Sequence, residues 1–510
     1  MYIRRIKTRG TVCLQIGKKE KGKFILLKHV GGSSKPEKIE ILQLKAQEEL
    51  VKQKLKSTHQ ISLFLPPLNV ENRAKLINWH ITGFHQIFGH IYDSIGFPGG
   101  LLRDLVVARI VYPKSKLATV AYLNQYLGIE SSIDPIYRFL DTLDKSELTK
   151  IAFDFVSKKN DGVALIFYDV TTLYFESNDE DDLRKKGFSK DHKNELPQIV
   201  IGLFVDKDGY PFDFDFYEGS MFEGHTFPMS IKALVEKYKF KPSDLVIVAD
   251  AGMLSEKNIN FLETENLNYI VGARLKGLSE KIKKPIFLHD FTKILFFDTT
   301  YQIKIQNGEI RDKRLIIDYS EKRAKKDKYN RDKLIKKLEE KISSKKPLVR
   351  KSKYLILENQ GTIAGVDTKK VELDKRHDGL KGYWTNLKLN LEPNDQSQNK
   401  NEPQEIIDQY HNLWKVEKAF RMSKSDLQER PIFHHKKARI SGHLLICFCS
   451  LLVMKEVERI LKPTEISLIK TIQILGKVGQ GEAIFGKLKL PIDSELGDEA
   501  KIIFNQILGH

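Results

Sequence analysis

The sequence predicts an α/β protein with a central sheet, and three observations predict this fold class. Short apolar runs alternate with helical patterns over residues 161–275, which is typical of a sheet covered by helices. Helical periodicity dominates residues 61–160, and residues 276–402 combine β-like runs with an excess of basic residues. The chain has 510 residues, of which 41% are hydrophobic, enough for a sizeable core and for two to four domains of roughly 100–200 residues each.

The N-terminal part, residues 1–60, is predicted to be a β/α segment. Two β-like runs, Val12 to Ile16 and Phe24 to Val30, end at a pair of glycines. Ser34 and Glu37 then have the spacing of a capping box, and the apolar residues that follow repeat at helical intervals. We therefore expect two strands followed by one helix.

Residues 61–160 are predicted to be mainly helical. A helix over Leu101 to Tyr112 should end at Pro113, and Ser115 can cap the next one. Three cations lie near these expected helix ends, namely Arg109, Lys114 and Lys116. They are candidates for phosphate contact, and a solvated helical linker is an equally good explanation of their charge.

Residues 161–275 carry the pattern of the central sheet. The five expected strands are Val163 to Tyr168, Ile199 to Val205, Phe212 to Phe216, Leu245 to Ala249 and Tyr269 to Ala273. Turn residues join the second and third strands, and helices are expected before and after the fourth. Three hairpin-connected strands followed by helix, strand, helix and strand make up the ribonuclease-H-like arrangement.

Residues 276–402 are predicted to be an insertion, and residues 403–510 a helical C-terminal region. Between Glu321 and Lys353 there are 15 Lys or Arg and five acids. Such a run is often only a solvated face, but the excess is one-sided. The lysines that we single out for phosphate contact are Lys325, Lys326, Lys336 and Lys337. One helix is expected from Gln404 to about Asp426, and helices again from Ala438 onward.

The charge of the chain points to a polyanionic partner. It has 85 Lys and Arg against 67 Asp and Glu, a net charge of +18 and a pI of about 9.3. Cations near phosphates release condensed counterions, so nucleic acid fits this excess. A membrane partner is disfavoured, because the longest apolar run, Leu444 to Met454, is far shorter than the roughly 20 residues of a spanning helix. Three cysteines and no signal-peptide pattern suit a reducing cytoplasm.

Two aspartates follow neighbouring apolar strands of the expected sheet. Asp169 comes directly after the first strand and Asp250 after the fourth. Polar side chains at strand ends face the ligand site of an α/β sheet. Two carboxylates there could hold Mg²⁺, which takes one or two carboxylates together with substrate phosphate. A structural aspartate that caps a turn or helix is the commoner explanation for either residue alone.

A third acid, Glu417, lies in the expected helix of the C-terminal region. Tyr410, Glu417 and Lys424 are seven residues apart, close to two helical turns, and should share one face. A phenol, an acid and a cation are unusual for a core stripe. An ordinary amphipathic helix, with its apolar edge at Leu413 and Val416, is the alternative.

The spacing of these three residues resembles a known motif. Bacterial insertion-sequence transposases with a DDE active site carry Tyr-x2-Arg-x3-Glu-x6-Lys, and Tyr410, Glu417 and Lys424 match it. Further stretches are similar to the same family: Arg109 to Lys116, Tyr137 to Asp141, Tyr168 to Thr172, Gly187 to His192, Val248 to Met253, Leu413 to Arg421 and Arg430 to His434. One departure is Leu413, which stands at the position of the motif's arginine; Lys415 and Arg421 are the nearby cations that could replace it.

The resemblance implies a specific chemistry. Asp169, Asp250 and Glu417 would hold two Mg²⁺ (or Mn²⁺) ions for two-metal phosphoryl transfer. Tyr410 and Lys424 would contact DNA, and Trp384 lies where relatives stack a flipped base, although a core aromatic is the commoner role. The fold implied is a ribonuclease-H-like catalytic core with a largely β insertion and a mainly helical N-terminal DNA-binding region.

The implied function is that of a transposase. It would bind terminal inverted repeats, cleave DNA at transposon ends and join the 3′-OH to target DNA as a homodimer in a synaptic complex. It would work in the cytoplasm, associated with the nucleoid. Two alternatives stay open from the sequence: a nuclease of the same fold without strand transfer, and an inactive DNA-binding protein descended from a transposase.

Overall fold

The computed structural model describes residues 1–8, 10–57, 75–253, 255–291, 296–304, 309–344, 353–357, 363–387, 403–485 and 488–509. The chain divides into two compact units. Met1–Thr82 and Lys477–Leu496 form the first unit, and Gly83–Gly476 and Gly497–His510 form the second.

The first unit begins with an antiparallel three-stranded sheet and one long helix. The strands are β1 (Tyr2–Thr8), β2 (Thr11–Glu20) and β3 (Lys23–Ser33), and the helix is α1 (Pro36–Ser57). Alternate residues of β2, such as Leu14 and Ile16, are buried, and α1 packs on this sheet through buried residues such as Ala46. The two strands and the helix expected near the N-terminus are therefore confirmed.

The first unit also contains a sheet built from both ends of the chain. It has the order β16-β15-β4, with β4 (Lys75–Ile81), β15 (Gly479–Phe485) and β16 (Leu488–Asp493). The expectation of helices throughout the C-terminal region is wrong here. Glycines explain the difference, because a Cβ at Gly479 would meet the ring of Trp79 at 2.8 Å in the paired strand.

The second unit contains a helical layer built around one apolar helix. The helices are α2 (His90–Ile95), α3 (Leu101–Val111), α4 (Lys116–Tyr126), α5 (Ile133–Thr142), α6 (Lys145–Asn160) and α14 (Lys437–Leu461). α14 is buried over most of its length and packs against α2, α3, α5 and α6. Ser115 caps α4 by accepting a hydrogen bond from the amide of Ala118, as the sequence predicts.

Residues 90–160 are mainly helical, as expected, but the structure does not show the helical N-terminal DNA-binding region that the resemblance implies. The N-terminus consists of strands, and the helices of residues 90–160 belong to the same unit as the large sheet. Their apolar faces need a partner, and the apolar run Leu444 to Met454 of α14 supplies it. Within the described ranges, no helix combines the length and the apolar composition that a bilayer crossing requires.

A mixed eight-stranded sheet forms the centre of the second unit, with the order β10-β11-β14-β9-β8-β5-β6-β7. The five strands expected from the sequence are β5 (Leu165–Tyr174), β6 (Gln198–Asp206), β7 (Pro211–Glu218), β8 (Val246–Ala249) and β9 (Asn268–Ala273). β5, β6 and β7 pair antiparallel, whereas β5, β8 and β9 run parallel. α7 (Glu223–Tyr238) connects β7 to β8, and α8 (Glu256–Thr264) connects β8 to β9. This order is consistent with a ribonuclease-H-like transposase core.

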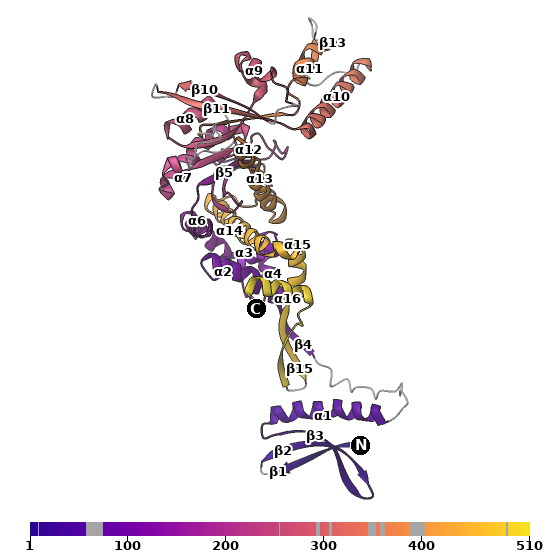
Figure 1. Ribbon diagram of the computed structural model, residues 1–510. Helices are drawn as coiled ribbons and strands as arrows, with labels where there is room; N and C mark the ends of the chain where they lie inside the picture. Colours follow the sequence, from indigo (N-terminus) through magenta and orange to yellow (C-terminus); the bar gives the residue numbers. More distant parts are fainter. Residues whose placement is uncertain are drawn as a thin grey trace, which may run out of the picture. The chain divides into compact units, whose positions relative to one another are not determined.

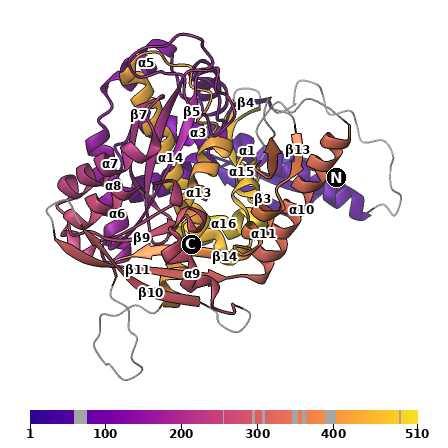
Figure 2. The same cartoon turned by 90° about the horizontal axis from the view of Figure 1, so that it is seen from above.

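The region expected to be a largely β insertion extends this sheet. β14 (Leu380–Thr385) pairs with β9, and β11 (Ile310–Tyr319) and β10 (Phe296–Lys304) continue outward, as Figures 1 and 2 show. The rest of the region comprises α9 (Glu280–Phe287), α10 (Glu321–Ser343), the pair β12 (Leu355–Leu357) and β13 (Ile363–Val366), and α11 (Thr368–Lys375). The basic segment 321–343 forms a helix, because it lacks Gly and Pro and packs Leu338 against Tyr354 and Val371.

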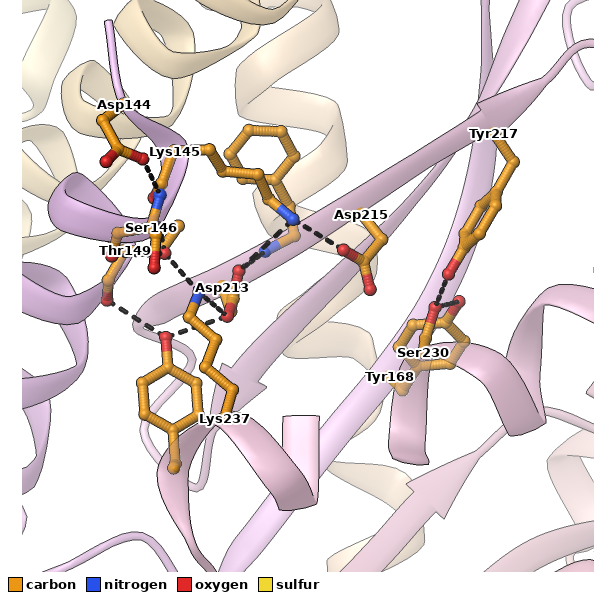
Figure 3. A network of polar contacts seen from close by, with 12 residues as sticks. Asp144, Lys145, Ser146, Thr149, Tyr168, Asp213, Asp215, Tyr217, Ser230 and Lys237 are labelled. Carbon is orange, nitrogen blue, oxygen red and sulfur yellow. Dashed lines mark hydrogen bonds and ion pairs between the residues drawn. The ribbon is translucent and has the colours of Figure 1, made fainter. Parts of the chain in front are cut away.

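A polar network fixes α6 to the edge of the sheet (Figure 3). Asp213 of β7 is buried and accepts hydrogen bonds from Lys237 and from the hydroxyl of Tyr238, both over 2.8 Å. Lys145 of α6 pairs with Asp215 at 2.6 Å. Because a buried carboxylate is costly unless it is paired, this network holds the helical layer in place on β7.

Candidate active site

The register of two parallel strands makes Asp169 and Asp250 neighbours. β5 pairs with β8 from Leu165 opposite Val246 to Tyr168 opposite Ala249, and the two aspartates are the next residue on each strand. β8 ends there, whereas β5 continues to Tyr174, so the strand carrying Asp169 does not end where the sequence suggested. The two carboxylates come together at the point where the parallel pairing stops.

Burial among like charges raises the pKa of Asp169 to about 6. Desolvation is the largest cause, and Asp250 and Glu223 add to it, while Lys190 and the amide of Val170 oppose it. The ammonium of Lys190 lies 3.9 Å from Oδ1 of Asp169 and 3.1 Å from Oε1 of Glu223, the first residue of α7. Lys190 therefore faces two carboxylates, and Asp250 adds a third negative charge beside Asp169, which a further cation would balance.

Tyr410 positions Asp250. Its hydroxyl donates a hydrogen bond to Oδ1 of Asp250 over 3.0 Å, and its ring is buried. Gly272 of β9 makes room for this contact, because a Cβ there would lie 2.4 Å from the hydroxyl oxygen. Tyr410, which the resemblance implies contacts DNA, thus holds the Asp250 carboxyl through its hydroxyl.

The single helix expected over residues 404–426 consists of three pieces. α12 (Pro403–His411) and α13 (Trp414–Arg421) are separated by a tight turn, and a π-helical turn follows over Met422–Asp426. The amide of Val416 bonds the carbonyl of Leu413, three residues back, so the helical repeat is broken between Tyr410 and Glu417. Tyr410, Glu417 and Lys424 therefore do not share one regular helix face.

Glu417 lies on α13 with its side chain exposed. It acts together with Asp250 on Lys381 of β14, because both acids raise the pKa of this lysine against the dominant effect of its burial. The Lys381 ammonium lies 4.5 Å from the ring centroid of Tyr410. Lys381 is a site residue that the sequence did not suggest, since only the pairing of β14 with β9 brings it here.

The described residues contain no group of three or more His, Cys, Asp or Glu side chains arranged to hold a metal ion. The structure thus brings Asp169 and Asp250 together, but it does not add Glu417 to them as a preformed ligand set. The aspartate pair fits a hard divalent cation, because its donor atoms are all oxygens. Burial among like charges also raises the pKa of the Asp169 carboxyl, and a cation beside it would balance these charges.

Lys424, the lysine of the motif, forms an ion pair with Asp191. Its ammonium lies 3.2 Å from Oδ2 of Asp191, and Arg430 reaches the same oxygen at 2.9 Å. Burial is the main cause that lowers the pKa of Lys424. Leu413, at the position of the motif's arginine, is buried, so no cation points outward from that site. Of the two possible substitutes, Arg421 is exposed and Lys415 donates to the carbonyl of Lys207 at 2.5 Å.

The remaining candidates for DNA contact differ in accessibility. The lysines of α10 that were singled out (Lys325, Lys326, Lys336 and Lys337) and Lys114 are all exposed. Trp384 is only 4% exposed and packs against Lys313 and Tyr301, which favours its core role over base stacking. Arg109 and Lys116 are buried and line a cavity, so the alternative of a solvated linker is wrong for these two residues.

Comparison with known protein families supports the assignment of this chain to one of them. The sequence model described as "Transposase DDE domain" matches residues 164–453, more than half of the chain. A comparison with curated proteins finds no match.

Two solved structures are similar at low scores. A piggyBac transposase synaptic complex with hairpin DNA is 12% identical, with a TM-score of 0.35 and coverage of 77% of this chain and 76% of that chain. A pre-cleavage Mos1 transpososome is 9% identical, with a TM-score of 0.16 and coverage of 34% and 60%. These scores are too low to relate the folds, so the assignment rests on the domain match. Asp169 and Asp250 both lie within the matched residues, and the chain belongs to the family of transposases with a DDE domain.

Proposed function

We propose that this protein cleaves DNA at the ends of a mobile element and joins the freed 3′-OH to target DNA. The observation that carries the proposal is the register of β5 and β8, which sets Asp169 beside Asp250 with the Asp169 carboxyl desolvated among like charges. Such a site is suited to a divalent cation and a phosphodiester, the reactants of polynucleotidyl transfer.

Asp169, Asp250 and Glu417 are the residues that would hold Mg²⁺ or Mn²⁺ in this proposal. Two such ions, when bound, supply an activated water and stabilise the leaving oxygen. Tyr410 orients Asp250 through its hydrogen bond, and Lys190 balances the charge of Asp169 and Glu223. Glu417 is included because its charge, like that of Asp250, acts on both Lys381 and Tyr410, and because its side chain is exposed on a short helix.

The bonds exchanged are phosphodiester bonds. Water attacks the phosphorus at the element's end, the P–O3′ bond breaks, and the products are a 3′-OH and a 5′-phosphate. The freed 3′-OH then attacks a phosphorus of target DNA, forming one P–O bond while another breaks. In this proposal the exposed lysines of α10 and the cations Lys114, Lys415 and Arg421 contact the DNA backbone. The partners are terminal inverted repeats, target DNA and a second copy of this chain.

A cleavage assay and a joining assay together test this function. Purified protein is incubated with Mg²⁺ or Mn²⁺ and labelled duplexes that carry candidate terminal repeats, and separately with pre-cut ends and a target plasmid. Asp169→Asn and Asp250→Asn should abolish both reactions, while Asp208→Asn, at an exposed turn of the same sheet, should leave them unchanged. Cleavage without joining would support a nuclease, and binding without either reaction would support an inactive DNA-binding protein.

A further inference from the structure

A cavity of about 400 Å³ lies between the end of α3, the start of α4, the segment 428–434 and α14. Its charged lining is entirely basic. The basic side chains that line it are Arg109, Lys114, Lys116, Arg430, His434 and His443. No acidic side chain is among the described residues that line this cavity.

Lys116 is the central observation. It is 5% exposed and makes no hydrogen bond or ion pair within the described ranges of the chain. Burial lowers its pKa well below the usual range, and the charge of Arg109 adds to this effect. A buried ammonium without a partner is costly, so an anion in the cavity would stabilise it.

The basic neighbours of Lys116 have partners, but not for every donor atom. Arg109, also 5% exposed, makes one hydrogen bond among the residues that the structure describes, from Nη1 to the carbonyl of Leu427 at 3.4 Å. Within the described ranges of the chain, the Nε–H of Arg430 is buried without a hydrogen-bond partner. Several hydrogen-bond donors around this cavity therefore lack an acceptor among the described residues.

The acids near this cluster are already engaged. Glu429 is buried and accepts a hydrogen bond from the hydroxyl of Ser423 at 2.5 Å, and it does not line the cavity. Asp191 lies on Lys424 and on Nη1 of Arg430. Neither carboxylate offers Lys116 an ion pair.

The two histidines of the cavity lie in the same excess of positive charge. Burial, followed by the charges of Lys116 and Arg109, lowers the pKa of His434 to about 4. The pKa of His443 is also lowered, by burial first and then by the same two cations. Both rings are therefore neutral near pH 7. His443 donates its one N–H, on Nε2, to the carbonyl of Glu429 at 2.9 Å, so His434 is the ring whose N–H can donate to an anion.

The first turn of α4 completes the cavity wall. Ser115, Lys116, Leu117 and Ala118 line it, so the positive end of this 11-residue helix meets the unpartnered Lys116 ammonium. An anion with several acceptor oxygens would satisfy the helix amides, Lys116 and Arg109 together, and phosphate is the group that matches such a donor set.

We propose that this cavity is a phosphate-binding site in which Lys116, Arg109, His434 and the N-terminus of α4 hold one phosphate group. In a protein acting on DNA, the group is either a backbone phosphodiester or the 5′-phosphate at a cut end. This assignment to DNA rests on the proposed function, whereas the phosphate site itself does not.

Inorganic phosphate is the first probe. Calorimetric titration of the full chain should give saturable 1:1 binding, and Lys116→Met should weaken it at least tenfold. His434→Gln should also weaken it, whereas Lys158→Met, which removes an exposed charge from α6, should not. Lys116→Met should raise the melting temperature without phosphate, because methionine keeps the volume and removes the buried charge. Absence of saturable binding in the wild type, or equal binding in wild type, Lys116→Met and His434→Gln, would overturn the site.

Binding experiments with modified DNA duplexes distinguish the two sources of the phosphate group. Duplexes that end in a 5′-phosphate or a 5′-OH are compared with duplexes that carry methylphosphonates at internal positions. A preference for the 5′-phosphate that disappears in Lys116→Met identifies a cut end as the ligand. Loss of affinity only with internal methylphosphonates identifies the backbone, and no dependence on either overturns the DNA assignment. Asp169→Asn should still bind inorganic phosphate, so failure of the catalytic proposal is distinguishable from failure of this one.

Discussion

The hydroxyl of Tyr410 reaches Oδ1 of Asp250 over 3.0 Å through a space that only a glycine, Gly272, leaves open. Tyr410→Phe removes this hydrogen bond and should lower end cleavage roughly tenfold, with a higher Mg²⁺ requirement, because Asp250 loses its orientation. Stability should fall by about 1 kcal/mol, as expected for one hydrogen bond. The measurement is the Mg²⁺ dependence of cleavage, and an unchanged half-saturation point would contradict the positioning role.

Gly272→Ala tests the contact between Tyr410 and Asp250 by placing a methyl group against the Tyr410 hydroxyl. The added Cβ would lie 2.4 Å from the Tyr410 hydroxyl and 3.0 Å from the amide of Ala251, so the variant should lose about 1–3 kcal/mol of stability. In a Tyr410→Phe background the loss should be smaller, because the shortest of these contacts, to the Tyr410 hydroxyl, is gone. Denaturant unfolding of the four proteins in this double-mutant cycle measures the coupling, and purely additive losses would argue against a shared contact.

The raised pKa of Asp169 predicts how the stability of the protein changes with pH. Its folded pKa of about 6 lies above its usual value of 3.8, so the folded state binds the proton more tightly than the unfolded state. The ionised carboxylate therefore destabilises the metal-free protein, and this loss develops as pH rises from about 4 to 6 and stays constant above. Asp169→Asn should be more stable than wild type by about 1–3 kcal/mol at pH 7.5 and equal to it near pH 4.

Melting temperatures of both proteins across this pH range, without divalent ions, give the measurement. Mg²⁺ should then raise the melting temperature of the wild type above pH 6 and have little effect on Asp169→Asn. A variant that is no more stable than wild type at pH 7.5 would show that Lys190 already compensates the charge of Asp169.

Glu417→Gln keeps the shape of the side chain and removes its charge. We expect binding to terminal DNA to persist while Mg²⁺-dependent cleavage falls by orders of magnitude, since a metal ligand is lost. The matched control is Glu405→Gln, an exposed acid in the first turn of α12, which should cleave as wild type does. Normal cleavage by Glu417→Gln would remove this residue from the carboxylate set.

Lys424→Ala should impair cleavage more than DNA binding. The variant leaves Asp191 with Arg430 as its cation, so the loop should stay folded with a stability loss of about 1 kcal/mol. Lys424→Arg should restore only part of the activity, because the two cations differ in shape and hydration. Equal losses of cleavage and binding in Lys424→Ala would identify a general backbone contact instead of a residue of the reaction site.

The core of the fold could be predicted because its signals are local. Each of the strands β5 to β9 is a short apolar run bounded by turn residues or helix caps, and the alternation with helices determines the order. The two aspartates follow from the same pattern, since parallel strands present the residues after them at one edge of the sheet. The long extension of β5 beyond Asp169 was missed, because its apolar run is interrupted by that polar residue.

The missing parts of the site depend on tertiary contacts. Lys381 reaches Tyr410 only because β14 joins β9, and no local pattern specifies that pairing. The break between α12 and α13 occurs without Gly or Pro, so helical spacing alone placed Tyr410, Glu417 and Lys424 on one face. The burial of Arg109 and Lys116 could not be predicted, because the cavity that they line involves α14, far along the chain.

The basic face of α10 provides the last prediction. Lys325, Lys326, Lys336 and Lys337 are all exposed, and only Lys325 has an ion pair among the residues that the structure describes, with Glu321. Replacing all four by Gln should therefore change stability little, because exposed pairs contribute little. If they contact phosphates, DNA binding should weaken and the slope of log affinity against log salt should fall by about 0.9 for each lost contact. The control replaces four exposed lysines elsewhere in the second unit, Lys158, Lys232, Lys257 and Lys281. A similar loss of slope in both variants would show that only net charge matters, and an unchanged slope in the α10 variant would show that this face is simply solvated.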